Sequence, residues 1–105
     1  MTSERPEPES LPPAAADAWR AYRRMLDSKS AHFGFLETLA EKYRHGGQRS
    51  LAEQARLATL LDEHDRRVKD FAAAMKRVAT DAPQARETLI GLMKESAAGD
   101  PATTH

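Results

Sequence analysis

Two of the four histidines, together with nearby aspartates, carry the strongest potential for chemistry in this sequence. His32 lies in the first half of the chain, and His64 lies further along between Asp62 and Asp65. Imidazole nitrogens and carboxylate oxygens bind zinc and other transition metals, so these four residues form a candidate site if the two segments lie side by side. The Glu-x-x-His pattern of di-iron bundles and cysteine are both absent. We therefore expect no metal or cofactor, and keep a metal or ligand site around His32 and His64 as the alternative.

His64 also falls within a row of apolar residues, where a polar side chain requires a partner. The pairing derived below places Lys29 or Ser30 opposite it. A group of Ser30, His64 and Asp27 would suit nucleophilic catalysis, but the sequence contains no Gly-x-Ser-x-Gly and nothing that indicates an oxyanion hole. Phosphotransfer on His32 or His64 is also conceivable in a helical bundle, but Ala31-His32-Phe33-Gly34 lacks the basic residue expected beside a phosphoacceptor histidine. We expect a structural polar layer, with Ser30 or Asp27 satisfying the ring, and no enzymatic activity.

The elements that must position these residues are helices. The interval between Pro13 and Pro83 contains no proline and is rich in alanine, leucine, arginine, glutamate and lysine, all of which favour helices. Gly46-Gly47 interrupts this interval, and glycine commonly ends a helix. The sequence therefore predicts an antiparallel hairpin of two helices, over about residues 14–45 and 50–80.

Two local signals mark further helix starts. Ser50 is followed three residues later by Glu53, which is the capping-box pattern at the start of the second helix. Pro83 is a weaker start signal for a short third helix over about residues 82–96. The fold class is therefore all-α.

Apolar residues recur at alternating steps of three and four in both long helices, which predicts a seam between them. The first row contains Trp19, Tyr22, Leu26, Phe33, Leu36, Ala40 and Tyr43, and the second contains Leu57, Leu61, His64, Val68, Phe71, Met75 and Val78. A short turn at the glycines pairs residues whose numbers add to about 94. The large rings of Trp19 and Tyr22 then face residues 72–75, three of which are alanine, as close packing requires.

The third predicted helix carries apolar residues on one face. They are Ala85, Leu89, Leu92 and Met93. This face completes either a three-helix bundle within the chain or, when two hairpins pair, a dimeric four-helix-type bundle. We favour a homodimer, because small chains commonly gain buried area by oligomerisation.

Domain organisation and location follow from composition. We expect a single helical domain over residues 14–96, between disordered tails at residues 1–13, which are acidic and rich in proline, and 97–105. The first residues lack the basic and apolar segments of a secretory signal, and Phe71–Met75 is far shorter than the ~18 apolar residues of a membrane span. We expect a soluble, cytoplasmic protein, of bacterial origin, that does not bind membranes.

The charges indicate a protein partner. The chain has 16 basic and 16 acidic residues, and zero net charge argues against nucleic-acid binding. We expect a small non-enzymatic interaction module that docks helix on helix, such as an adaptor, an assembly factor, a secretion-type chaperone or an accessory subunit. The expected apolar docking residues are Phe35, Leu39, Leu60, Leu89 and Met93. For Phe35 and Leu39 we favour contact within the protein itself, in its own dimer or with its third helix. A basic end, which would receive an acidic partner segment or the chain's own Glu4, Glu7 and Glu9, comprises Arg20, Arg23, Arg24, Lys76 and Arg77.

Overall fold

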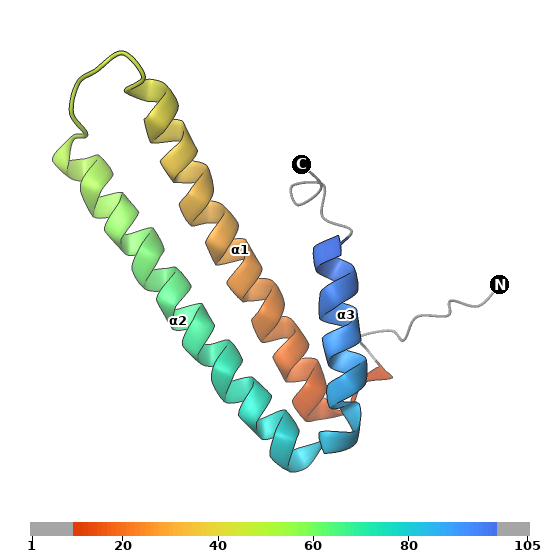
Figure 1. Ribbon diagram of the computed structural model, residues 1–105. Helices are drawn as coiled ribbons and strands as arrows, with labels where there is room; N and C mark the ends of the chain where they lie inside the picture. Colours follow the sequence, from red (N-terminus) through yellow and green to blue (C-terminus); the bar gives the residue numbers. More distant parts are fainter. Residues whose placement is uncertain (1–9, 99–105) are drawn as a thin grey trace.

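The computed structural model describes residues 10–98, and within that range it consists of three α-helices and no strand (Figure 1). α1 spans Pro13–Lys42, α2 spans Leu51–Asp81 and α3 spans Arg86–Ala98. A short 3-10 turn, η2, spans Pro83–Ala85 between α2 and α3. The prediction of an all-α chain with a long hairpin and a short third helix is confirmed.

The predicted tails lie mostly outside the described residues, which exclude 1–9 and 99–105. Pro13 is the first residue of α1, because a proline at the first helical position loses no hydrogen bond. Ala97 and Ala98 complete α3. The helical region therefore extends slightly further at both ends than predicted, whereas α1 ends at Lys42, before the predicted residue 45, and η2 occupies the predicted start of the third helix.

The turn between α1 and α2 depends on two glycines. Gly46 and Gly47 have φ angles of 107° and 100°, in the left-handed region that glycine adopts without strain. A Cβ atom on Gly47 would also lie 3.2 Å from the ring of Tyr43. These glycines let α2 turn back along α1, and we call this end of the hairpin the closed end.

The capping box at the start of α2 is confirmed, and it is part of a larger polar network. The Ser50 hydroxyl accepts a hydrogen bond from the Glu53 backbone N–H at 3.0 Å, and a Glu53 carboxylate oxygen accepts one from the Ser50 N–H at 2.8 Å. Lys42 Nζ donates to the same carboxylate at 2.6 Å, and the Tyr43 hydroxyl also donates to it. Hydrogen bonds from Lys42, Tyr43 and the Ser50 backbone lower the pKa of Glu53 to about 2. Glu53 therefore links the end of α1 to the start of α2.

Contacts along the hairpin confirm the predicted pairing of α1 with α2. The rings of Tyr22 and Phe71 have centroids 5.7 Å apart, and the bond between Lys42 and Glu53 lies near the closed end. The residue numbers add to 93 and 95 in these two pairs, and to 92 for the contact between Ser28 and His64, so the pairing lies within two of the predicted 94. The helices are thus antiparallel neighbours over their whole length (Figure 1).

The third helix packs against its own hairpin at the open end, where α1 begins and α2 ends (Figure 1). Leu89 of α3 is fully buried there, and the Tyr22 hydroxyl donates to the backbone carbonyl of Met93 at 3.3 Å. The buried cluster at this end comprises Ala15, Ala18, Ala74, Val78, Ala82, Ala85 and Leu89. The chain by itself therefore forms the three-helix arrangement, and the homodimer stays a prediction.

Part of the predicted seam is wrong. Phe33, Leu61 and Val68 were expected in the seam, but their exposed fractions are 52%, 45% and 40%. Leu39, which was expected outside it, is 1% exposed. Phe33 lies two heptads after Trp19, and residues at heptad spacing share one side of a helix. Trp19 packs against the cluster that contains Leu89, so Phe33 lies on the side of the hairpin that α3 covers, and not between α1 and α2.

Candidate functional site

The predicted apolar docking residues do not form one accessible surface. Leu39 and Leu89 are 1% and 0% exposed, so both contribute to the core of the chain itself. Phe35 and Leu60 are half-buried, and the Arg56 guanidinium lies 5.5 Å from the centre of the Phe35 ring. Met93 packs half-buried against the cluster under α3, so self-contact within the chain accounts for the α3 residues. The expectation of an exposed docking stripe is therefore wrong for Leu39 and Leu89.

A different apolar surface is accessible, and we call it the open apolar face. It comprises Leu26, Phe33, Leu61 and Val68. By the confirmed pairing, Phe33 lies across from Leu61 and Leu26 lies across from Val68. Trp19 and Met75 pack against the core cluster. The two pairs lie on the same side of the hairpin as Trp19 and Met75, because they follow these residues at intervals of seven.

The open apolar face exists because α3 is short. α3 has 13 residues, which is ~20 Å of helix, whereas α1 has 30 residues and extends ~45 Å. Met93 is already level with Tyr22, so α3 ends well before the closed end. Leu26, which lies next along α1, is half-buried, and Phe33 further along is more exposed. α3 therefore covers this side of the hairpin near the open end and leaves it exposed near the closed end.

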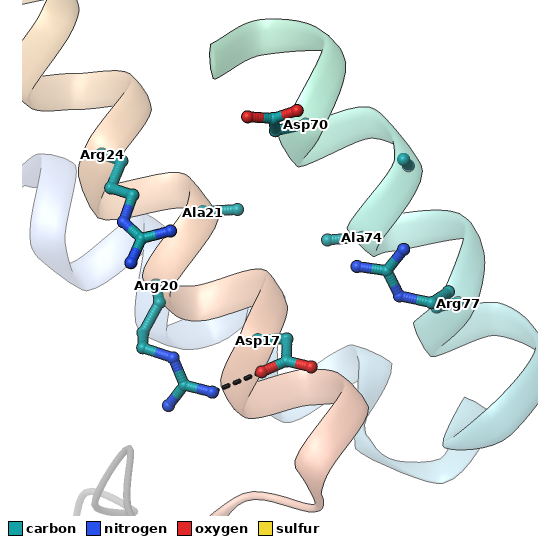
Figure 2. Close-up of a pocket in the computed structure, with 8 residues that line it drawn as sticks. Asp17, Arg20, Ala21, Arg24, Asp70, Ala74 and Arg77 are labelled. Atoms are coloured by element: carbon teal, nitrogen blue, oxygen red, sulfur yellow. Dashed lines mark hydrogen bonds and ion pairs between the residues drawn. The ribbon is translucent and has the colours of Figure 1, made fainter. Parts of the chain in front are cut away.

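Three of the five predicted basic residues come together, on the opposite side of the hairpin. Arg20, Arg24 and Arg77 line a groove of about 290 Å³ with Asp17 and Asp70 (Figure 2). Its remaining lining residues are Ala21, Ala73 and Ala74. α3 lies behind the hairpin in this view. The basic surface is thus a groove on the side of α1 and α2 near the open end of the hairpin, and it contains three of the five predicted residues.

The other two predicted basic residues lie elsewhere. The Arg23 guanidinium lies 6.0 Å from the centre of the Trp19 ring, and Trp19 packs against the core under α3. Lys76 does not line the groove. Successive residues are rotated by 100° around a helix, so neighbours such as Arg23 and Arg24 lie on different sides of α1. Basic residues that are close in the sequence therefore do not all lie on one surface.

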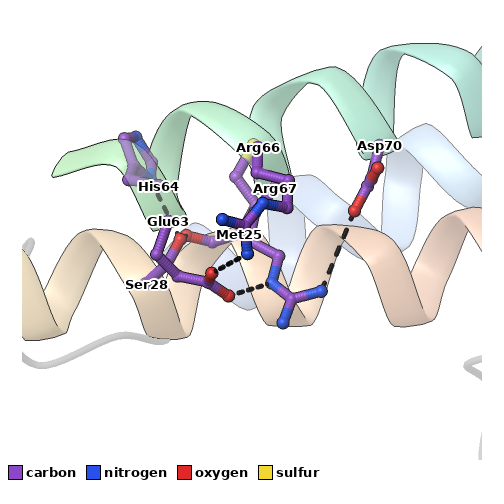
Figure 3. A network of polar contacts seen from close by, with 7 residues as sticks. All are labelled: Met25, Ser28, Glu63, His64, Arg66, Arg67 and Asp70. Atoms are coloured by element: carbon purple, nitrogen blue, oxygen red, sulfur yellow. Dashed lines mark hydrogen bonds and ion pairs between the residues drawn. The ribbon is translucent and has the colours of Figure 1, made fainter. Parts of the chain in front are cut away.

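His64 has a specific partner, which is Ser28 and neither Lys29, Ser30 nor Asp27. Its Nδ1 lies 3.0 Å from the Ser28 hydroxyl, which itself donates to the carbonyl of Met25 at 2.8 Å (Figure 3). A serine hydroxyl has one hydrogen, so we assign Nδ1–H as the donor to Ser28. Activation of a serine nucleophile requires the reverse, with the imidazole accepting the hydroxyl proton. The geometry is that of a satisfied polar layer inside the seam.

The neighbouring ion pairs belong to α2 alone. Glu63 accepts from Arg66 at 2.5 Å and from Arg67 at 2.7 Å, and Arg67 also lies 3.8 Å from Asp70 (Figure 3). Pairs three or four residues apart on one helix stabilise it modestly. Glu63 and Asp70 are therefore matched by arginines of their own helix.

The alternative metal or ligand site is not assembled. The ring of His32 lies 5.7 Å from that of Phe33, and His64 is bonded to Ser28. Among residues 10–98, no three histidine or carboxylate side chains gather closely enough to hold a metal ion. His32, His64, Asp62 and Asp65 thus do not share a site.

Sequence reasoning missed two features of this arrangement. Trp19, Leu26 and Phe33 fit the predicted seam by their spacing. Residues seven apart, however, equally define a face at the side of the helix, away from the seam. Ser28 was overlooked because its neighbours Lys29 and Ser30 satisfied the approximate pairing equally well. A stricter heptad count from Leu39 back through Met25 would have placed the seam on the Ser28 side of α1.

Comparisons with known protein families, curated proteins and solved structures find no match to this chain. Within the described residues, no helix combines the length and apolar character needed to cross a membrane. The class of protein that the structure defines is thus a small helical hairpin with a short third helix packed against its open end.

Proposed function

We propose that this chain is a non-enzymatic protein-interaction module, and that its open apolar face binds an amphipathic helix of another protein. The observation that carries the proposal is the pair of Phe33 and Leu61, which lie across from each other and are 52% and 45% exposed. Burial of half-exposed large apolar side chains is favourable, so such a pair provides the free energy for docking.

The expected occupant follows from what already covers this side of the hairpin. α3 is an amphipathic helix that buries Leu89 and Leu92 against the same side near the open end. The uncovered part of α1, from about Leu26 to Lys42, corresponds to ~25 Å of helix. We therefore expect a helix of about 16 residues, with apolar residues at steps of three and four, lying in line with α3.

The charges near the surface fit a protein partner better than a nucleic acid. The chain has no net charge, and the long helices expose acidic and basic side chains in similar numbers. An adaptor, an assembly factor, a secretion-type chaperone or an accessory subunit, acting in the cytoplasm, is the setting in which we expect this surface to be used.

Site-specific photocrosslinking tests the proposal. A photoreactive phenylalanine analogue replaces Phe33 in the cells that produce the protein, and the same analogue replaces Leu51 as the control, because Leu51 is 83% exposed at the closed end. The proposal predicts that Phe33, and not Leu51, crosslinks to one apolar-patterned segment of another protein. Crosslinks joining two copies of this chain, or equal and diffuse crosslinking from both positions, would overturn it.

A further inference from the structure

We propose that the groove between α1 and α2 binds an acidic helical segment of a partner, which Arg24 and Arg77 hold by its carboxylates. This acidic-helix groove is lined by Asp17, Arg20, Ala21, Arg24, Asp70, Ala73, Ala74 and Arg77. It lies on the side of the hairpin away from α3, so the inference is independent of the open apolar face (Figure 2).

The charged side chains inside the groove do not all pair with one another. Arg20 pairs with Asp17 on α1, and Asp70 lies 3.8 Å from Arg67 on α2. Arg24 and Arg77 make no ion pair with any residue in the described part of the chain. The aspartates are thus matched on their own helices, and two guanidinium groups, one from each helix, remain to receive carboxylates.

The neighbouring hollow does not change this balance. It has a volume of about 310 Å³ and shares Arg24 with the acidic-helix groove. Asp27 lines this second hollow without an ion pair to Arg24, and Glu63 there is held by Arg66 and Arg67. Arg24 therefore has guanidinium hydrogens that no carboxylate of residues 10–98 occupies.

The groove is lined by small side chains between its charged residues. Ala21 and Ala74 point toward each other between the two helices (Figure 2), Ala73 also lines the groove, and alanine has no side-chain atom beyond Cβ. Helices approach most closely where small residues meet, so a third helix could lie directly over these alanines. Arginine side chains on both walls would then reach past these alanines to the sides of that helix.

The spacing of the two arginines specifies the occupant. The pairing of the hairpin places Arg77 across from Asp17, and Arg24 follows Asp17 by seven residues on α1. The backbone positions of the two arginines are therefore about two helical turns apart, ~10 Å along the axis. Glutamates seven residues apart on a helix, with small residues between them, match this spacing.

A peptide of known sequence tests the inference on the full chain. The probe is an alanine-rich helical peptide with two glutamates seven residues apart, and the control peptide has the same composition with its glutamates on opposite faces. We expect the probe to shift the amide NMR signals of Ala73 and Ala74 in a saturable manner, and to bind about tenfold more tightly than the control peptide. Equal binding of the two peptides, or no shift at these alanines, would overturn the inference.

Variants of the protein separate the groove from general charge attraction. Arg24→Gln with Arg77→Gln should weaken probe binding about tenfold. Arg49→Gln with Arg86→Gln removes the same charge from exposed positions outside the groove and should leave it unchanged. Ala73→Leu adds bulk to the lining of the groove without altering any charge and should weaken binding by a similar factor. Equal losses in the groove and control variants would contradict the assignment.

The chain's own acidic residues are the competing occupant. Glu4, Glu7 and Glu9 lie outside the described residues, and their replacement by glutamine in the full chain tests this alternative. Unchanged Ala73 and Ala74 signals in the absence of peptide support the partner assignment. Shifts that match those produced by the probe would overturn it.

Discussion

Replacement of Leu89 by alanine tests whether α3 is part of the folded core. Leu89 is 0% exposed and belongs to the cluster formed by both long helices and η2. Its side chain is the largest that α3 buries completely. The surrounding alanines cannot extend into the space that Leu89→Ala would leave, whereas the longer side chains of Met75 and Met93, which pack against the same cluster, would fill part of it.

The expected cost combines lost burial with an unfilled cavity. Leucine-to-alanine substitutions in cores reduce the free energy of unfolding by about 2–5 kcal/mol, and the alanine-rich surroundings place Leu89 near the middle of that range, at about 3 kcal/mol. For a chain of this size, each kcal/mol lowers Tm by about 4–8 °C, so we expect a decrease of about 12–24 °C.

Circular dichroism melts of Leu89→Ala and Leu51→Ala measure this effect directly. Leu51 is 83% exposed, so its substitution should change Tm by no more than about 2 °C. Trp19 fluorescence, which reports on the packing under α3, should change in the Leu89 variant alone. Equal melting temperatures and equal Trp19 spectra for both variants would refute the packing of α3 on the hairpin.

Three further predictions concern the hairpin itself. Ser28→Ala should lower the free energy of unfolding by about 1 kcal/mol in urea titrations, because His64 loses its hydrogen-bond acceptor; the exposed Thr38→Ala should cost less, and equal costs would contradict the polar layer. Gly34→Ala should stabilise α1 by about 0.5–1 kcal/mol, since nothing lies within 4 Å of the added Cβ, whereas Gly47→Ala should destabilise the chain because of its positive φ and the nearby Tyr43 ring. The same sign for both glycine variants would count against the turn geometry. The folded pKa of Glu53, about 2, is below its ordinary 4.5, so its contribution to stability is present above about pH 4.5 and is lost as pH falls toward 2; Glu53→Gln should flatten the pH dependence of Tm in that window, and an unchanged slope would contradict the network.

Local signals explain why the helices could be predicted. Proline, the Gly46-Gly47 pair and the Ser50–Glu53 capping box act through the backbone within a few residues of themselves. Because the turn is short, it also fixes which residues of α1 and α2 pair. The helix bounds and the pairing of Tyr22 with Phe71 were therefore accessible from the sequence.

The rotation of each helix about its own axis was not accessible. Neighbouring heptad rows of α1 are both apolar, so Leu39 and Phe33 are equally good seam residues by composition, yet their exposed fractions are 1% and 52%. A single-residue step rotates a side chain by 100°, which is the difference between Ser28, which contacts His64, and Lys29, which is exposed. Packing among the three helices decides this rotation, and no short sequence pattern predicts it.

The two candidate surfaces also depend on how the helices are rotated and where they end. The basic residues of the acidic-helix groove were recognised by type, but Arg23 stacks near Trp19 while Arg24 faces the groove. The open apolar face depends on where α3 ends relative to α1, which is a tertiary property. Both surfaces thus required the three-dimensional arrangement of the helices.

The central claim is that the open apolar face binds a helix, and the most direct measurement is calorimetric binding of the segment that crosslinks at Phe33. Phe33→Lys with Leu61→Lys is the disrupting variant, and Leu51→Lys is its control. Full burial of a large apolar side chain contributes about 1.5–3 kcal/mol, and about half of each of the two side chains is still exposed. The account predicts an affinity at least about tenfold weaker for the double variant and unchanged for the control. Equal affinities for the wild-type chain and the double variant would contradict it.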